Sequence, residues 1–395
     1  MAGVPPASTM RPVRNLAQQL LAHLRGQTEE MTALLLDLAR LESPSLDAAA
    51  QEPVFARLTT ELEAAGLRVR RLPGQRTGGQ LWAVPRERRR GAPAQLLLGH
   101  CDTVWAHGTV ETMPVEIVDG RLTGPGVYDM KAGLVQGIFA LRALRDLGLT
   151  PEVTPAFFID SDEEIGSLES IPRLERAARR MRRVFVLEPS LGPEGKLKTR
   201  RKGSLRFTLH IRGRAAHSGL DPEKGASAIL ELARVIQRLY ELADPERGIT
   251  VNVGVVAGGL RANVVAPEAR AELDVRVLAW EDALRLERTI QDLAAVTPGT
   301  TLEVRGGIDR PPLEATPGNR LLWGAAQRRA ADLGLPLAEG TAGGASDGSL
   351  TSRFVPTLDG LGAVGDGAHA LHEHVLVDRM PERAALLALL LLEPS

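Results

Sequence analysis

The sequence contains one cysteine, Cys101, in 395 residues. A single thiol cannot form a disulfide within the chain, so the fold has to be stable without one. This suits a reducing compartment. Residues 1–15 lack the apolar core of a signal peptide. Together, these two absences lead us to expect a cytoplasmic protein.

Long apolar runs and a surplus of charge are also missing. The apolar run at 386–392 is shorter than the roughly 18 residues that indicate a membrane span, so we interpret it as a buried helix. The net charge is −1, and no basic stripe with interleaved aromatic residues occurs. We therefore expect neither a membrane nor a nucleic-acid partner.

Candidate functional residues begin in the segment 96–133, which starts with LLLGHCDTV. Three leucines predict a buried strand that ends at Gly99. Residues two apart in an extended segment point to the same side, so His100 and Asp102 share a face and Cys101 points away. Asp102 can then orient His100, as an oxygen partner usually orients a metal-bound imidazole. The alternatives are an ordinary loop histidine and, for Cys101, a nucleophile or soft ligand instead of a packed thiol.

Further acids lie next to the ends of other predicted elements. Asp129 precedes a helix predicted at 134–144, where the positive helix end favours an ionised carboxylate. The segment 160–167, DSDEEIGS, follows a strand predicted at 155–159. Four acids in five residues repel one another unless a cation lies among them. An exposed acidic turn is the alternative reading.

Two more candidate ligands lie later in the chain. Glu188 ends the apolar run at 184–187, and His369 closes the segment GDGAH. Carboxylates and imidazoles at the ends of strands are typical of a metal site. The sequence therefore predicts one.

Seven motifs occur in this order: GHCDTV, GPGVYDMKAG, DSDEEIGS, VLEPS, GRAAHSG, GGASDG and GAHALHEHV. With them the chain resembles the M20 family of metallopeptidases, and within it the carboxypeptidase G2 (glutamate carboxypeptidase) subgroup. The resemblance runs from about Leu35 to the end. It implies an α/β fold, in which a mixed-sheet α/β/α dizinc exopeptidase domain carries an inserted α+β, ferredoxin-like lid and dimerisation domain.

The resemblance also implies two Zn²⁺ ions per subunit, with Co²⁺ or Mn²⁺ as substitutes. Asp129 would bridge both ions. His100 and Glu188 would complete one site, and Glu164 and His369 the other. The peptide bond after Asp129 is expected in the cis form.

Three residues have catalytic roles by the same resemblance. Glu163 would be the general base, which takes a proton from the attacking water and passes it to the leaving amine. Asp102 would support the ligands without binding metal. His217, in the GRAAHSG turn, would reach the partner subunit's active site in a homodimer and help to hold the oxyanion. A histidine that only satisfies its own turn is the alternative.

Recognition of a substrate carboxylate is implied for four residues. Arg310 matches the family arginine that grips this group, and the planar guanidinium suits a bidentate contact. Asn263 matches a lid residue near the same carboxylate. Gly343 and Gly344 offer backbone N–H groups to it.

Lys196 and Thr341 resemble the glutamate-selective pocket of the subgroup, with a solvated Lys196 as the alternative. We therefore expect a zinc-dependent hydrolase that releases a C-terminal amino acid, preferably glutamate, from a small peptide or an N-acyl amino acid. An N-acyl amino-acid deacylase (aminoacylase) or a dipeptidase of the same family is the alternative. A non-catalytic binding protein would lack the base or a ligand, and neither is missing.

The chain is too long for one core, which predicts two domains. Strands and helices alternate as far as Glu188, as in α/β layers. Residues 200–312 have the order β-α-β-β-α-β and form the predicted lid and dimerisation domain. This insertion divides the catalytic domain into 1–199 and 313–395. We further expect disorder as far as about residue 12 and a helical pattern over 16–41.

The last motif departs from the family pattern. Many members have H-x-x-D-E-Y after the metal histidine, whereas here the run is HALHEH. His372 and His374 are therefore additional imidazoles near the predicted site. They could tune its pH dependence, but surface positions are the simpler interpretation.

Overall fold

The computed structural model describes residues 7–88 and 91–394, and the chain divides into two compact units. The first unit consists of Met1–Thr199, Ala315–Thr341 and Ser346–Ser395, so it is discontinuous in sequence. The second consists of Arg200–Glu314 and the short segment Ala342–Ala345. That segment carries the two glycines of the GGASDG motif, which the sequence analysis had assigned to the catalytic part of the chain.

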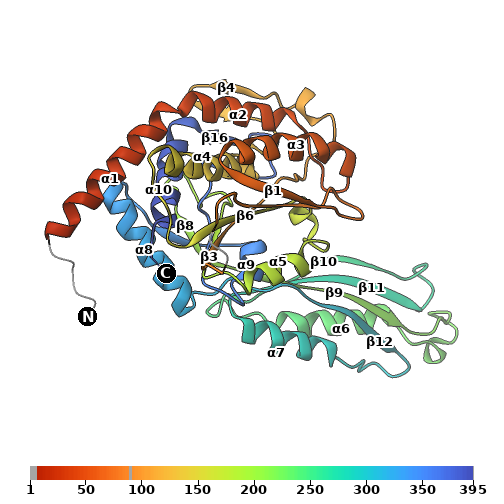
Figure 1. Ribbon diagram of the computed structural model, residues 1–395. Helices are drawn as coiled ribbons and strands as arrows, with labels where there is room; N and C mark the ends of the chain where they lie inside the picture. The colour runs from red at the N-terminus through yellow and green to blue at the C-terminus, as the bar shows by residue number, and fades with distance from the viewer. Residues whose placement is uncertain (1–6, 89–90, 395) are drawn as a thin grey trace. The chain divides into compact units, whose positions relative to one another are not determined.

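A six-stranded mixed sheet forms the middle layer of the first unit (Figure 1). In sheet order its strands are β1 (Leu67–Leu72), β2 (Gln80–Pro85), β6 (Thr154–Asp160), β3 (Ala94–His100), β7 (Val184–Val186) and β14 (Thr357–Leu358). β3 is parallel to both of its neighbours, β6 and β7, whereas β2 is antiparallel to β6. The carboxyl ends of β6, β3 and β7 therefore lie at one edge of the sheet.

Helices cover both faces of this sheet. One face carries α1 (Ala7–Gly26), α2 (Thr28–Arg40), α3 (Ala48–Ala64), α4 (Ala132–Asp146), α8 (Pro317–Leu333) and α10 (Met380–Leu391). The other carries α5 (Ile171–Ala178) and α9 (Asp347–Thr351). The predicted α/β class with a mixed sheet is thus confirmed.

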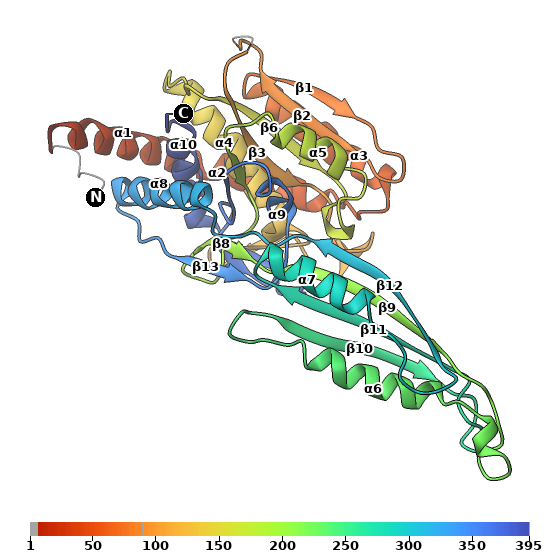
Figure 2. The ribbon, with the colours of Figure 1, turned by 90° about the horizontal axis from the view of Figure 1, so that it is seen from below.

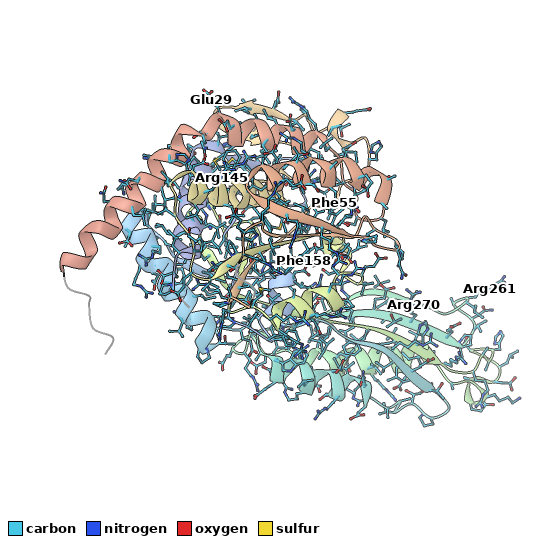
Figure 3. The ribbon with its side chains drawn as sticks, viewed as in Figure 1. Glu29, Phe55, Arg145, Phe158, Arg261 and Arg270 are labelled. Carbon is cyan, nitrogen blue, oxygen red and sulfur yellow. The ribbon has the colours of Figure 1, made fainter. Side chains whose placement is uncertain are left out.

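The alternation of side chains along β3 divides the interior into two cores. Leu97 packs with the larger set of helices, whereas Leu96 and Leu98 pack with α5 and α9. Figure 3 labels one phenylalanine from each core, Phe55 and Phe158. Both rings are almost fully buried, so each face of the sheet contributes to stability.

The N-terminal region corrects two expectations. α1 begins at Ala7, so the chain is already helical before residue 12, while residues 1–6 lie outside the described part. The helical pattern of 16–41 is interrupted at Gln27, between α1 and α2. Gly26 is the last residue of α1, and glycine commonly ends helices because it stabilises them poorly.

Short strands form two smaller sheets. One contains β15 (Gly365–Asp366), β16 (His374–Leu376), β5 (Arg121–Thr123) and β4 (Glu116–Val118), and the other pairs β13 (Glu339–Ala342) with β8 (Leu197–Arg201). Segments this short carry no periodic pattern, so the sequence did not predict most of them. Among the described residues, no helix is both long enough and apolar enough to cross a bilayer.

The second unit is an antiparallel sheet covered on one face by two helices (Figure 2). Its elements follow in chain order as β9 (Gly203–Arg212), α6 (Ala228–Tyr240), β10 (Thr250–Gly258), β11 (Glu268–Val277), α7 (Trp280–Gln291) and β12 (Thr301–Arg310). The order β-α-β-β-α-β is as predicted. Alternate residues of β9, such as Leu205 and Leu209, point into the core shared with both helices.

A buried guanidinium fastens α10 to loops of the first unit. Arg383 is only 4% exposed and donates hydrogen bonds to the carbonyl oxygens of Gly362 and Gly195, both at 3.0 Å, and to that of Gly360. Burial lowers the pKa of Arg383 to about 10, so the side chain stays charged at neutral pH. One side chain thus satisfies three carbonyl oxygens.

Replacing Arg383 by methionine should therefore be costly. We expect Arg383→Met to lower the free energy of unfolding by about 3–5 kcal/mol, because several buried acceptors lose a partner at roughly 1–3 kcal/mol each. Arg379→Met is the matched control: Arg379 is more exposed and pairs with Glu382 at 2.7 Å. Its change should stay within about 1 kcal/mol. Urea unfolding followed by circular dichroism measures both, and equal losses would show that the buried contacts contribute nothing special.

Candidate metal centre

Three neighbouring strands bring candidate ligands to the same edge of the sheet. His100 is the last residue of β3, and Glu164 follows the end of β6 by four residues. Glu188 follows the end of β7 by two residues. Because these strands are parallel neighbours in the order β6, β3, β7, their carboxyl ends converge, and the sequence separation of the ligands becomes spatial proximity.

Asp129 comes from a different element, the turn Val127–Lys131 that leads into α4. The peptide bond between Asp129 and Met130 is cis, as the resemblance implied. His369 enters from the loop after β15 with a φ of 61°, in the left-handed region that non-glycine residues seldom adopt. The C-terminal segment of the discontinuous unit thus delivers a histidine to the other four side chains.

The five predicted ligands lie around the carboxylate of Asp129. Its Oδ1 is 3.3 Å from Nε2 of His100, and its Oδ2 is 3.4 Å from Nε2 of His369. Nε2 of His100 is 3.5 Å from Glu188 Oε1, and Nε2 of His369 is 3.1 Å from Glu164 Oε2. Each oxygen of Asp129 therefore faces its own imidazole–carboxylate pair, as in a ligand that bridges two ions.

Two atoms at this centre show that the residues fit metal ions. Nε2 of His100 and Oδ1 of Asp129 are buried and make no hydrogen bond within the part of the chain that the structure describes. A buried polar atom without a partner is rare in native proteins and requires an explanation. Here the two atoms belong to ligand types that bind divalent ions, and the candidate groups His100–Asp129–Glu164 and His100–Glu163–Glu188 each lie within 4.8 Å.

Because these carboxylates and imidazoles lie so close together, their pKa values are shifted. Burial raises the pKa of Glu164 to about 7, with the Asp129 carboxylate adding to this and His369 opposing it. The Asp129 and Glu164 carboxylates raise the pKa of His369 to about 10. Burial alone would lower the pKa of His100, but the carboxylates of Asp102, Asp129 and Glu188 raise it well above its ordinary value. The carboxylates thus favour positive charge on both imidazoles.

Asp102 supports this centre from behind. Its backbone oxygen is 3.1 Å and its Oδ1 is 3.4 Å from Nδ1 of His100. The same carboxylate accepts hydrogen bonds from the backbone N–H groups of Glu163 (3.3 Å) and Glu164 (3.2 Å), and from the Ser45 hydroxyl at 2.7 Å. One buried acid therefore positions an imidazole and both neighbouring glutamates, which is more than the sequence analysis assigned to it.

Glu163 and Cys101 occupy contrasting environments. Glu163 is half-buried in the turn Glu163–Ile165. One of its carboxylate oxygens lies within 4.8 Å of ligand atoms of both His100 and Glu188. Cys101 is fully buried, and burial raises its thiol pKa well above the ordinary value. A thiolate is needed for nucleophilic attack or for binding a soft metal, so the interpretation as a packed thiol holds.

Two acids of the DSDEEIGS motif are not among the ligands. Asp162 accepts hydrogen bonds from the backbone N–H of Glu169 at 2.8 Å and from the Ser170 hydroxyl. Asp160 is fully buried, and burial with the nearby Asp347 carboxylate raises its pKa well above the usual range. These contacts explain how four acids can lie so close together in the sequence.

A carboxylate that the sequence analysis missed holds the Asp129 turn. Glu373 is buried and accepts hydrogen bonds from the backbone N–H groups of Gly126 (3.0 Å), Tyr128 (2.9 Å) and Asp129 (3.0 Å). It also accepts one from the Trp105 indole at 2.9 Å. The sequence did hold a signal for it, because Glu373 is the E that this chain keeps of the H-x-x-D-E-Y pattern, between the two extra histidines. His372 is exposed and His374 is partly exposed, in agreement with surface positions.

Two lysines of β8 and the preceding turn have different surroundings. Nζ of Lys198 lies 3.6 Å from Oε2 of Glu188, and the side chain is mostly buried. Lys196, predicted for the glutamate pocket, is 39% exposed and lies 3.5 Å from Glu194. Thr341, its predicted companion, is exposed at β13. Lys198 was not predicted, because only the contact with Glu188 distinguishes it from the other lysines.

The remaining predicted residues lie in the second unit. Nδ1 of His217 accepts hydrogen bonds from the backbone N–H groups of Gly219 and Leu220, both at 3.1 Å. The ring hydrogen must then be on Nε2, which is left as a donor on an exposed side chain. Asn263 is exposed and lies beside this turn, because its carbonyl accepts from the Ser218 N–H at 3.1 Å.

Arg310 ends β12 and is only 7% exposed. Gly343 and Gly344 are exposed, and neither has a positive φ. Their backbone conformation therefore does not itself require glycine.

The sequence profile of peptidase family M20/M25/M40 matches residues 96–393. Carboxypeptidase G2 of Pseudomonas sp. (strain RS-16) is 26% identical over 379 residues, covering 93% of this chain and 91% of that protein. Succinyl-diaminopimelate desuccinylase of Rhodopseudomonas palustris is 25% identical over 392 residues, covering 91% and 97%.

Solved structures show the same fold. The aminopeptidase PepT of Bacillus cereus superimposes with a TM-score of 0.78 at 22% identity, covering 92% of this chain and 98% of that one. A dinuclear metal-binding peptidase of the M20 family from Bacillus subtilis gives 0.70 at 16% identity, covering 93% and 98%.

The profile begins at Leu96, in the strand that delivers the first candidate ligand, and it extends past His369, the last. The likeness therefore includes every strand end and turn that builds the metal centre. This chain belongs to peptidase family M20/M25/M40.

Proposed function

We propose that this hydrolase cleaves the amide bond to a C-terminal amino acid, preferably glutamate, in a small peptide or an N-acyl amino acid. The observation that carries the proposal is the position of Asp129, whose two oxygens face the separate pairs His100–Glu188 and His369–Glu164. Imidazole and carboxylate donors suit zinc, so we assign two Zn²⁺ ions, with Co²⁺ or Mn²⁺ as substitutes.

Two bound divalent ions would lower the pKa of an attacking water and polarise the scissile carbonyl. Side chains of the protein carry out the proton transfer and position the reacting groups. Glu163 takes the proton of the water and delivers it to the leaving nitrogen, because its carboxylate lies beside His100 and Glu188. Asp102 keeps His100 and the Glu163–Glu164 backbone in place for this transfer.

His217 supplies a hydrogen-bond donor to the oxyanion through Nε2, the nitrogen that its own turn leaves with the hydrogen. We propose that it acts on the partner subunit of a homodimer. Arg310 binds the substrate carboxylate, helped by Asn263 and by the backbone N–H groups of Gly343 and Gly344.

Selectivity for glutamate is assigned to Lys196 and Thr341. The Lys196 ammonium is exposed enough to exchange Glu194 for an acidic substrate side chain, since an exposed ion pair is weak. The alternative is deacylation of an N-acyl amino acid, as the name of the desuccinylase relative indicates for that protein. We expect the enzyme to work in the cytoplasm, because its single thiol suits a reducing compartment.

Removing the general base should separate metal binding from turnover. We expect Glu163→Gln to retain two metal ions per chain and to lower kcat by about 100- to 10,000-fold, the usual contribution of a positioned base. Elemental analysis and the hydrolysis of an N-acyl-glutamate measure the two properties. Glu175→Gln, on the surface of α5, is the control and should change neither. Activity near the wild-type level in the Glu163→Gln variant would refute the role of Glu163.

Lys196→Ala should change which substrate is preferred. We expect kcat/KM for an N-acyl-glutamate to fall about 10- to 100-fold, because a charge-assisted contact is lost, with little change for the corresponding N-acyl-leucine. Lys224→Ala, an exposed lysine of the second unit, is the control. An unchanged preference for glutamate would remove Lys196 from the pocket while leaving the metal chemistry intact.

The role of His217 in the partner subunit can be tested by mixing two inactive variants. In equal mixtures of His217→Ala and Glu163→Gln chains, half of the dimers should be mixed, and each mixed dimer should have one complete site. Activity should then recover to about a quarter of the wild-type value, as expected for a two-fold symmetric assembly. Different affinity tags on the two chains verify that mixed dimers form. Mixed dimers without activity would show that His217 does not serve its neighbour.

A further inference from the structure

A cavity of about 430 Å³ lies between α5 and the β1–β2 edge of the six-stranded sheet. It belongs entirely to the first unit, and it contains neither Glu163 nor any of the five proposed metal ligands. Its size is within the range of about 300–1,000 Å³ that is typical of small-molecule sites. The cavity is therefore a separate place on the protein, and the proposed reaction does not use it.

The floor of the cavity is aromatic and apolar. Trp82 of β2 and Phe158 of β6 meet edge to face, with ring centroids 6.3 Å apart. Phe158 is buried, whereas Trp82 is only partly buried and so offers ring surface to the cavity. Leu72, Pro73, Ala177 and Met181 complete the apolar lining. A surface of this kind suits a flat ring, since aromatic groups favour stacked or edge-to-face contacts.

The walls are strongly basic. Arg173, Arg176 and Arg180 follow one another at intervals of three and four residues along α5 and the turn after it, so they lie on one side. Arg70 faces them from β1. Arg70, Arg176 and Arg180 are exposed, and none has a carboxylate partner among the residues that the structure describes.

Arg173 is already held in place. Its Nη1 donates hydrogen bonds to the backbone oxygen of Pro73, at 3.1 Å, and to the side-chain oxygen of Gln80. Both contacts use Nη1, so Nε and Nη2 of the Arg173 guanidinium take no part in these two hydrogen bonds. A fixed guanidinium loses less conformational freedom when it binds an anion than a free one does.

The acids around the cavity are engaged elsewhere. Glu169 accepts backbone hydrogen bonds from Gln75 and Arg76 at 2.9 and 2.7 Å. Glu175 pairs with Arg179 on the other side of the helix at 3.9 Å.

Glu52 pairs with Arg71 at 2.6 Å, and the Arg71 side chain turns to the opposite face of the sheet, where it lies 3.4 Å from the centre of the Phe55 ring (Figure 3 labels Phe55). Of the five arginines that line the cavity, Arg71 is therefore paired, whereas the other four have no carboxylate partner among the described residues, although the net charge of the whole chain is only −1.

Uncompensated guanidinium groups that face one cavity repel one another unless an anion lies among them. Arginine binds phosphate oxygens in a planar, bidentate manner, and the Trp82–Phe158 floor adds a surface for a ring. We propose that this cavity binds an organic anion in which a planar ring is joined to two or more phosphates, as in a nucleoside di- or triphosphate. The phosphates contact Arg70, Arg176 and Arg180, and the ring lies against Trp82.

Binding of ATP, tripolyphosphate and adenosine to the zinc-loaded enzyme tests this proposal, by equilibrium dialysis with excess Mg²⁺ at low and at physiological salt. We expect ATP to bind more tightly than either fragment, because only ATP uses both floor and walls. The affinity should fall as salt rises, since the contacts are ionic and exposed. Equal affinities for ATP and tripolyphosphate would overturn the assignment of a nucleotide.

Variants locate the site. The triple variant Arg70→Ala, Arg176→Ala and Arg180→Ala should weaken ATP binding by at least about 100-fold, at roughly tenfold for each charged contact, while metal content stays the same. Trp82→Leu should weaken ATP but leave tripolyphosphate unchanged.

The matched control Arg40→Ala, Arg121→Ala and Arg261→Ala removes the same charge at exposed positions elsewhere and should retain ATP affinity. Thermal unfolding of each variant shows whether it is folded. An equal loss in the control, or no binding of ATP to the wild type at about 1 mM, would overturn the proposal.

Discussion

Mutual repulsion among carboxylates is the constraint on which the architecture of this site depends. Asp129, Glu188 and the adjacent pair Glu163–Glu164 come from three separate parts of the first unit and converge within a few ångströms. Bringing such groups together without positive charge costs free energy. This repulsion is offset by two imidazoles and by the Lys198 ammonium beside Glu188, and the geometry of the carboxylates fits divalent ions. The parallel strands supply the rigid edge from which these opposing charges are presented.

The contacts that support the proposed ligands are as important as the ligands themselves. A side chain that binds metal must keep one orientation, and buried hydrogen bonds provide it. Asp102 does this for one side of the centre by holding His100 and the Glu163–Glu164 backbone. Glu373 does it for the other side by holding the turn of Asp129. Each support is itself an acid satisfied almost entirely by N–H and O–H donors, which lets it remain buried.

Much of this organisation could be predicted from the sequence, and the exceptions have physical reasons. Apolar runs such as 155–159 predicted the central strands, because burial on both faces leaves a continuous apolar pattern. The short strands β4, β5 and β13–β16 were missed, since two to four residues carry no period. The helix that begins at Ala7 was taken for disorder. The contacts of Glu373 and Lys198 depend on tertiary structure, which no local pattern encodes.

The contact between Glu373 and the Asp129 turn has a consequence for the order of assembly. Asp129 leaves the ribosome 244 residues before Glu373. Until the later residue emerges, the N–H groups of Gly126, Tyr128 and Asp129 lack the carboxylate that accepts from them in the folded protein. Domains tend to fold as units during synthesis. The second unit can therefore fold before the C-terminal part of the first unit has been made. The proposed metal centre can therefore be completed only after Glu373 has been made, when the strands β1, β2, β3, β6 and β7 are already available.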